Sequence, residues 1–173
     1  VVVLSDFKDI KRATFEVKKR KTGTTREVVV TVYDAGGQRE YFLASALFMK
    51  ERVTFLVAFD GQDMRITQVD GKIDPEKYQQ TIGTYIDLIC QNCANPCIQL
   101  LATKMDSMDG NERPLWKDIW HKVADHLNSF SNKTRQIVLA SEILNVSAKI
   151  ISEDQMKLIV SRTTALLLSE EIT

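Results

Sequence analysis

One stretch of the sequence, residues 27–38, limits the folds open to this chain more than any other. Residues 27–33 are almost all β-branched or aromatic, which favours a strand buried on both faces of a sheet. The run ends at Asp34, and Gly36 and Gly37 follow. Glycines let a ligand approach the backbone closely, and open α/β sheets bind ligands at the carboxyl ends of their strands. We therefore expect a binding site directly after this strand.

The composition indicates a single globular domain. The chain has 173 residues, of which 44% are hydrophobic and 27% charged, enough to bury a core. Lys plus Arg equals Asp plus Glu at 23 each, so the net charge does not favour nucleic-acid binding. No apolar run approaches the roughly 18 residues of a transmembrane helix, and no secretion signal is present. We expect a cytoplasmic protein.

Three cysteines, Cys90, Cys93 and Cys97, lie close together in the sequence. Their odd number and the lack of a secretion signal predict reduced thiols. A structural zinc site needs four well-placed ligands. Because His121 and His126 fall on a later predicted helix, a metal site at the cysteines is disfavoured.

The order of the predicted elements indicates the fold class. Apolar periodicity predicts strands at residues 1–4, 13–17, 27–33, 53–60, 98–102 and 136–140, and helices at residues 78–89, 115–130 and from Ser152 onward. A basic turn around Gly23 joins the second strand to the third, so these two should form an antiparallel hairpin. Strands then alternate with helices. This order predicts a doubly wound α/β sheet, mostly parallel, with one antiparallel hairpin strand.

Polar clusters follow three of the predicted strands, at residues 34–38, 103–106 and 147–149. In a mostly parallel sheet the carboxyl ends lie at one edge, so the three clusters should lie close together. At these clusters the sequence resembles the Ras-like GTPases: the first is similar to D-x-x-G-Q, the second to N/T-K-x-D and the third to S-A-K. Residues 33–42 and 56–60 look closest to the Roc domains of the Roco proteins, which a COR domain usually follows.

This resemblance implies a role for each residue of the first cluster. Asp34 would hold Mg²⁺, and the N–H of Gly37 would reach the γ-phosphate, since a side chain there would keep the backbone away. Gln38 would act as the catalytic residue that orients the attacking water, because positioning and charge stabilisation dominate phosphoryl transfer.

The other two clusters would bind the guanine base of GTP or GDP. Asp106 would accept hydrogen bonds from the guanine N1–H and 2-amino groups, a pair that adenine does not offer. The alkyl stem of Lys104 would lie along the base, and the N–H of Ala148 would donate to O6. The remaining residues of these guanine-binding motifs are Thr103, Ser147 and Lys149.

The phosphate loop of this family, G-x-x-x-x-G-K-[ST], is missing from the sequence. Gly71-Lys72 is the sole Gly-Lys pair, and Ile66 stands where the first glycine belongs. Two interpretations follow. Either the first strand, phosphate loop and first helix precede Val1 in a longer protein, or residues 1–4 are the remnant of the central strand and the loop has been lost.

The position of the first strand matters for the sheet. In the Ras-like order it lies between the second hairpin strand and residues 53–59. Without it, backbone groups on two buried edges lose their partners, at about 1–3 kcal/mol for each group. The slot must therefore be filled by residues 1–4, by a segment outside this chain or by a strand from a second copy.

Taken together, the sequence predicts one Ras-like, Roc-type G domain over residues 1–173. It would act as a regulatory signalling switch that binds GTP and GDP with Mg²⁺ and hydrolyses GTP slowly. This chain alone should bind nucleotide poorly, because the phosphate half of the site is missing. The alternative is a pseudo-GTPase, an interaction module that dimerises or contacts a COR domain without nucleotide turnover. A dinucleotide-binding oxidoreductase is disfavoured, since no G-x-G-x-x-G follows a strand.

Overall fold

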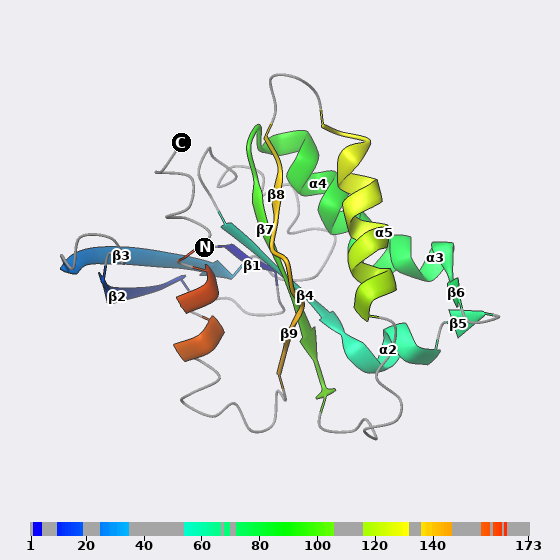
Figure 1. Ribbon diagram of the computed structural model, residues 1–173, viewed down its shortest axis with the longest axis horizontal. Helices are drawn as coiled ribbons and strands as arrows, with labels where there is room; N and C mark the ends of the chain where they lie inside the picture. Colours follow the sequence, from blue (N-terminus) through cyan, green and yellow to red (C-terminus); the bar gives the residue numbers. More distant parts are fainter. Residues whose placement is uncertain are drawn as a thin grey trace.

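The computed structural model describes residues 2–4, 10–18, 25–34, 54–66, 68–69, 72–105, 116–131, 136–146, 157–159, 161–163 and 165. Within these residues, seven strands form one open sheet (Figure 1). In spatial order they are β2 (Ile10–Lys18), β3 (Thr25–Asp34), β1 (Val2–Leu4), β4 (Thr54–Asp60), β7 (Cys97–Thr103) and β8 (Val138–Leu139), with β9 (Leu144–Asn145) also paired to β7. The fold is α/β with a mostly parallel sheet, as the sequence predicts.

The antiparallel part of this sheet is the hairpin of β2 and β3. Ile10 lies opposite Tyr33 at one end of the ladder, and Lys18 lies opposite Thr25 at the other. The other described pairings within the large sheet are parallel. The predicted hairpin is therefore confirmed, and each of its strands is longer than the apolar pattern alone indicates.

Strand β1 occupies the centre of the sheet. It is parallel to both neighbours, and Val2 lies opposite Tyr33 of β3 and Phe55 of β4. Residues 2–4 thus give β3 and β4 a shared partner, which removes the cost of two unpaired inner edges. Residues 5–9 are all that separates β1 from β2 along the chain.

Helices cover one face of the central strands. They are α2 (Gly61–Ile66), α3 (Pro75–Tyr78), the π-helical turn η1 (Gln79–Gly83), α4 (Thr84–Asn92) and α5 (Trp116–Asn128). Asp74 caps α3, because its side chain accepts the Glu76 N–H at 2.9 Å and Pro75 follows at the first helical position. Elements α3, η1 and α4 extend the predicted helix 78–89 at both ends. Within the described residues, no helix is both long and apolar enough to cross a bilayer.

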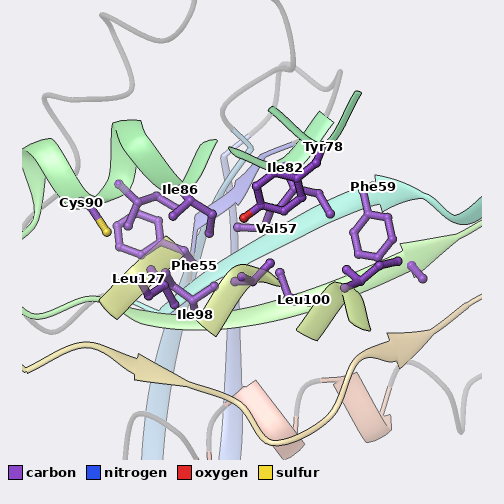
Figure 2. Close-up of a cluster of buried hydrophobic side chains, with 14 of the residues drawn as sticks. Phe55, Val57, Phe59, Tyr78, Ile82, Ile86, Cys90, Ile98, Leu100 and Leu127 are labelled. Atoms are coloured by element: carbon purple, nitrogen blue, oxygen red, sulfur yellow. The ribbon is translucent and has the colours of Figure 1, made fainter. Parts of the chain in front are cut away.

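The main core lies between β4, β7 and the helices (Figure 2). Side chains alternate across a strand, so every second residue of β4 and β7 faces the helices. The buried residues on this face are Phe55, Val57, Phe59, Ile98, Leu100 and Ala102. Helical spacing brings Ile82, Ile86, Ile89, Ile119, Val123 and Leu127 against them. Each such large side chain contributes about 1.5–3 kcal/mol by leaving water, so this layer is the main source of stability.

A smaller cluster lies on the opposite face of the sheet. Leu56 and Leu101 point that way and meet Leu144 and Val146. Ile159 packs on this cluster from the C-terminal helical residues, which Figure 1 draws on the side of the strands away from α4 and α5. The described helical residues there are 157–159, 161–163 and 165. The sheet is therefore covered from both sides, as a doubly wound arrangement requires.

Two regions differ from the sequence-based expectation. The polar stretch after β4 contains α2 and a small antiparallel pair, β5 (Gln68–Val69) and β6 (Lys72–Ile73). Of the strand expected at residues 136–140, the structure has only the two residues of β8. Strand β9 follows it and also pairs with β7. The side-chain amide of Gln99 donates to the Glu142 carbonyl at 2.8 Å, which bridges the break between β8 and β9.

Candidate functional site

Four strands that run in the same direction end along one edge of the sheet. They are β3 at Asp34, β4 at Asp60, β7 at Thr103 and β9 at Asn145. Asp60 and Thr103 are direct register partners. Strand β1 pairs with both β3 and β4, and its register places Asp34 level with Leu56. At about 3.3 Å per residue, β3 therefore ends about 13 Å before the end of β4. The edge is stepped, with Asp34 on the lower step.

Thr103 ends β7 and Lys104 follows it, beside the end of β4. The Thr103 hydroxyl donates to the Phe59 carbonyl at 3.1 Å, which fastens the two strand ends to each other. Lys104 has a φ of 57°, in the left-handed region that residues with a side chain rarely adopt. Such strained backbones persist where the surroundings hold them, and they cluster at binding sites. This conformation makes Lys104 the first candidate for a functional residue.

Asp60 joins Lys104 to helix α2. One carboxylate oxygen, Oδ2, lies 2.5 Å from the Lys104 ammonium. The other, Oδ1, accepts the N–H of Gln62 at 2.9 Å and that of Asp63 at 3.4 Å, as a helix N-cap does. Asp60 thus holds the lysine with one oxygen and the start of α2 with the other.

The charges of this pair stabilise each other. Partial burial of Asp60 opposes its ionisation, but the hydrogen bonds from Lys104, Gln62 and Asp63 outweigh that cost and hold the pKa of Asp60 below its ordinary value. The hydrogen bond with Asp60 and the charge of its carboxylate raise the pKa of Lys104. Both groups are therefore charged at neutral pH.

Gly61 allows close packing directly behind this pair. A Cβ atom there would lie 2.7 Å from the Met105 sulfur, 3.1 Å from the Thr103 carbonyl oxygen and 3.3 Å from Cη2 of Trp116. The N–H of Met105 points to the Val146 carbonyl at 3.4 Å. The loop after β7 is thus held against β4 on one side and approaches the segment after β9 on the other.

The structure places three of the residues that the sequence analysis assigned to a nucleotide site. Thr103 and Lys104 lie together at the end of β7, and the backbone of Asp34 ends β3 on the same edge. Outside the described residues lie Gly37, Gln38, Asp106, Ser147, Ala148 and Lys149. Val146, the last described residue before the third cluster, is hydrogen-bonded to Ala102 of β7 at 2.9 Å. The roles assigned to these residues and to Asp34 stay predictions.

Asp60 belongs to this candidate site through its contact with Lys104, although no sequence motif includes it. The sequence offered one indication, because β4 ends in an aspartate just as β3 does. Its contact with Lys104 spans 44 residues of chain, and no local pattern predicts such a pair.

Metal ligands do not converge in the part of the chain that the structure describes. No group of three or more His, Cys, Asp or Glu side chains there is arranged to hold a metal ion. The three cysteines are buried and form no disulfide. Mg²⁺ binding at Asp34 stays a prediction, since the structure describes only the backbone of that residue.

A second polar cluster lies among the helices, away from the strand ends. The Tyr78 hydroxyl lies 3.1 Å from Nδ1 of His126, whose Nε2 lies 2.9 Å from a carboxylate oxygen of Asp87. Burial and the nearby charge of Asp87 raise the pKa of Tyr78 far above its ordinary value, so the phenol stays protonated. The chain of contacts joins α3, α4 and α5, which is a structural role. The sequence places His126 on a predicted helix, but the network depends on contacts between residues far apart in the chain and was not predicted.

No protein-family model matches the chain, and no curated protein matches it in sequence. The resemblance to the Ras-like GTPases therefore stays a prediction from the three sequence motifs.

Proposed function

We propose that this chain is a Ras-like, Roc-type G domain that recognises guanine nucleotides at the carboxyl edge of its sheet. It would serve as a GTP- and GDP-dependent switch in a signalling protein. The position and backbone conformation of Lys104 are the main support for this proposal. This lysine lies at the end of a central parallel strand, in a left-handed backbone conformation and within a motif similar to T-K-x-D. Ligands of open α/β sheets bind at this edge.

The strand order supports the proposal. The Ras-like resemblance requires a first strand between the second hairpin strand and the next parallel strand. β1 lies between β3 and β4 and is parallel to both. The hairpin strand β2 is antiparallel and lies at the outer edge of the sheet.

Each motif would contribute one part of nucleotide recognition. Lys104, whose side chain is 60% exposed, would offer its alkyl stem to the base. Asp106 would accept hydrogen bonds from the guanine edge, and Ala148 would donate to O6. Asp34 would hold Mg²⁺, which supplies positive charge to the phosphates, and Gln38 would orient water.

The phosphate half of the site is incomplete within this chain. Residues 5–9 connect β1 to β2, whereas average globular helices alone take about 10–14 residues. A phosphate loop followed by a helix therefore does not fit between these strands. The chain by itself should bind nucleotide weakly and hydrolyse GTP poorly.

The short connection between β1 and β2 also favours the second candidate function. A pseudo-GTPase would keep the α/β scaffold and use it to bind a COR domain or a second copy of the chain. Under this candidate, binding of the partner does not depend on guanine recognition.

A nuclear magnetic resonance titration tests the proposal, since it detects weak binding. GDP added to the ¹⁵N-labelled chain should shift the amide signals of Thr103 and Lys104, and ADP at the same concentration should not. Asp106→Asn should abolish the response to GDP. Asp118→Asn, an exposed position on α5, is the matched control and should bind as the unmodified chain does.

The outcomes separate the candidates. Equal shifts with GDP and ADP would refute the guanine assignment, and no shift with either would refute nucleotide binding. Sedimentation of the unmodified chain and of Asp106→Asn then addresses the scaffold. Self-association that is identical in both proteins, without any response to GDP, would support the pseudo-GTPase.

A further inference from the structure

Lys104 is held at both ends of its side chain. At the backbone end, the Thr103 hydroxyl binds the Phe59 carbonyl and the lysine itself has a φ of 57°. At the other end, the ammonium lies 2.5 Å from Asp60. Between these two anchors runs the alkyl stem, in a side chain that is 60% exposed.

Asp60 is itself well positioned to act as an anchor. Its side chain is 22% exposed, so it is more confined than that of the lysine. The N–H groups of Gln62 and Asp63 hold its other oxygen. The carboxylate therefore has a direction fixed by helix α2, and the lysine follows that direction.

An exposed lysine without such a partner samples many rotamers on its flexible four-carbon stem. A ligand that packs on this stem must then order it, which weakens binding. A stem that is already extended toward Asp60 removes most of this cost. Its charge is also matched by Asp60, so the exposed stem presents an apolar surface to a flat, uncharged ring.

We propose that Asp60 is a positioning residue that clasps the Lys104 ammonium and so fixes the lysine stem as a platform for the purine base. This inference rests on the proposed function, because the base is the ligand that the platform serves. The clasp adds Asp60, at the end of β4, to a site otherwise assigned to the loops after β3, β7 and β9.

Two substitutions at Asp60 separate the clasp from the helix cap. Asp60→Asn keeps an oxygen that caps α2, since asparagine is as good an N-cap as aspartate, and removes the charge that holds Lys104. Asp60→Ala removes both functions. At neutral pH, Asp60→Asn gives up only the exposed ion pair with Lys104, so urea unfolding should show a small loss of stability for Asp60→Asn and a larger one for Asp60→Ala.

Binding of GDP provides the functional readout. Losing the pre-ordered lysine should weaken GDP binding of Asp60→Asn by roughly three- to tenfold, the range expected for ordering one long side chain. Lys104→Met keeps most of the stem but removes the ammonium, and it should lose a similar factor. In Lys104→Met, the further change Asp60→Asn should have no additional effect, because the two residues act as one unit.

The lysine itself gives a readout that does not require nucleotide. The pKa of the Lys104 ammonium, followed by nuclear magnetic resonance, should fall in Asp60→Asn, because the carboxylate that raises it is gone. A merely structural role for Asp60 as a helix cap would leave this pKa unchanged.

Each outcome decides between supporting and overturning the clasp. Weaker GDP binding of an Asp60→Asn protein that stays folded and more stable than Asp60→Ala, with no added loss in the double variant, supports it. A chain that prefers GDP to ADP and keeps its full affinity in Asp60→Asn overturns the clasp alone. A chain that does not respond to GDP at all overturns the proposed function, and the clasp with it.

Discussion

Replacing Gly61 by alanine tests how closely the strand ends are packed around the candidate site. The new Cβ would meet the Met105 sulfur at 2.7 Å, the Thr103 carbonyl at 3.1 Å and the Trp116 ring at 3.3 Å. The thioether can move aside, but the carbonyl belongs to the backbone and the ring is partly buried. Overpacking of this kind costs about 1–3 kcal/mol.

A gain in helix propensity opposes this cost. Alanine is favoured over glycine by up to about 1 kcal/mol in a helix, and Gly61 begins α2. The packing term is larger, so we expect Gly61→Ala to lower the free energy of unfolding by about 1 kcal/mol. The displaced loop should also disturb the backbone of Lys104.

Gly83 provides the matched control. The three atoms nearest to a Cβ there all belong to the side-chain end of Gln79, and its amide oxygen is the nearest at 2.5 Å. Gln79 is exposed and can turn away, although its hydrogen bond to Asp87 at 2.6 Å is then lost. The helix-propensity gain should roughly offset that loss, so Gly83→Ala should be neutral or slightly stabilising.

Urea unfolding of the two variants gives the comparison. With a difference of about 1–2 kcal/mol and an m-value of about 2 kcal/mol per molar urea, their midpoints should lie about 0.5–1 M apart. Equal midpoints, or a Gly61→Ala protein more stable than Gly83→Ala, would show that the strand ends are not packed as described.

Three further variants test other contacts of the fold. Trp120→Phe removes the indole N–H that donates to the Ala140 carbonyl at 2.7 Å, and thermal unfolding should show a loss of about 1–2 kcal/mol. His126→Ala breaks the network between α3, α4 and α5 and should cost about 1–3 kcal/mol, whereas His121→Ala, at an exposed position on the same helix, should change little. Because the pKa of Asp60 is lowered on folding, its ionised form stabilises the fold above the ordinary value of 3.8, and this contribution is lost as the pH falls through the lower folded-state pKa. The stability of Asp60→Asn should therefore fall less steeply than that of the unmodified chain below pH 3.8; equal acid slopes would contradict the shift.

The main sheet could be predicted because its strands leave strong local patterns. Long β-branched and aromatic runs mark β3 and β4, and both end in an aspartate at the carboxyl edge. The stripe of α5 is equally plain, since Ile119, Val123 and Leu127 recur at helical spacing and are all buried. These elements follow from periodicity, which a single sequence displays directly.

The elements that were missed are short. Helix α2 begins at a glycine and depends on the Asp60 cap, while β5 and β6 have two residues each and show no period. Between β8 and β9, the Glu142 carbonyl accepts a hydrogen bond from the amide of Gln99, 43 residues away in the chain. Such features are set by tertiary contacts, so a local pattern does not indicate them.

In the candidate site too, some features could be predicted from the sequence and others depend on tertiary contacts. Thr103 and Lys104 could be placed at the edge because they directly follow a predicted strand. The ion pair with Asp60 and the left-handed backbone of Lys104 could not, because both depend on how β4 and β7 lie side by side.

The proposed function requires a guanine base to pack on the stem of Lys104 at the carboxyl edge of the sheet. Isotope-filtered nuclear Overhauser measurements on the ¹³C-labelled chain with GDP test it most directly. We expect magnetisation transfer from the guanine H8 or ribose protons to the Lys104 methylene groups, and none with ADP at the same concentration. Transfer to the exposed face of α5 instead, or equal transfer from both nucleotides, would contradict it.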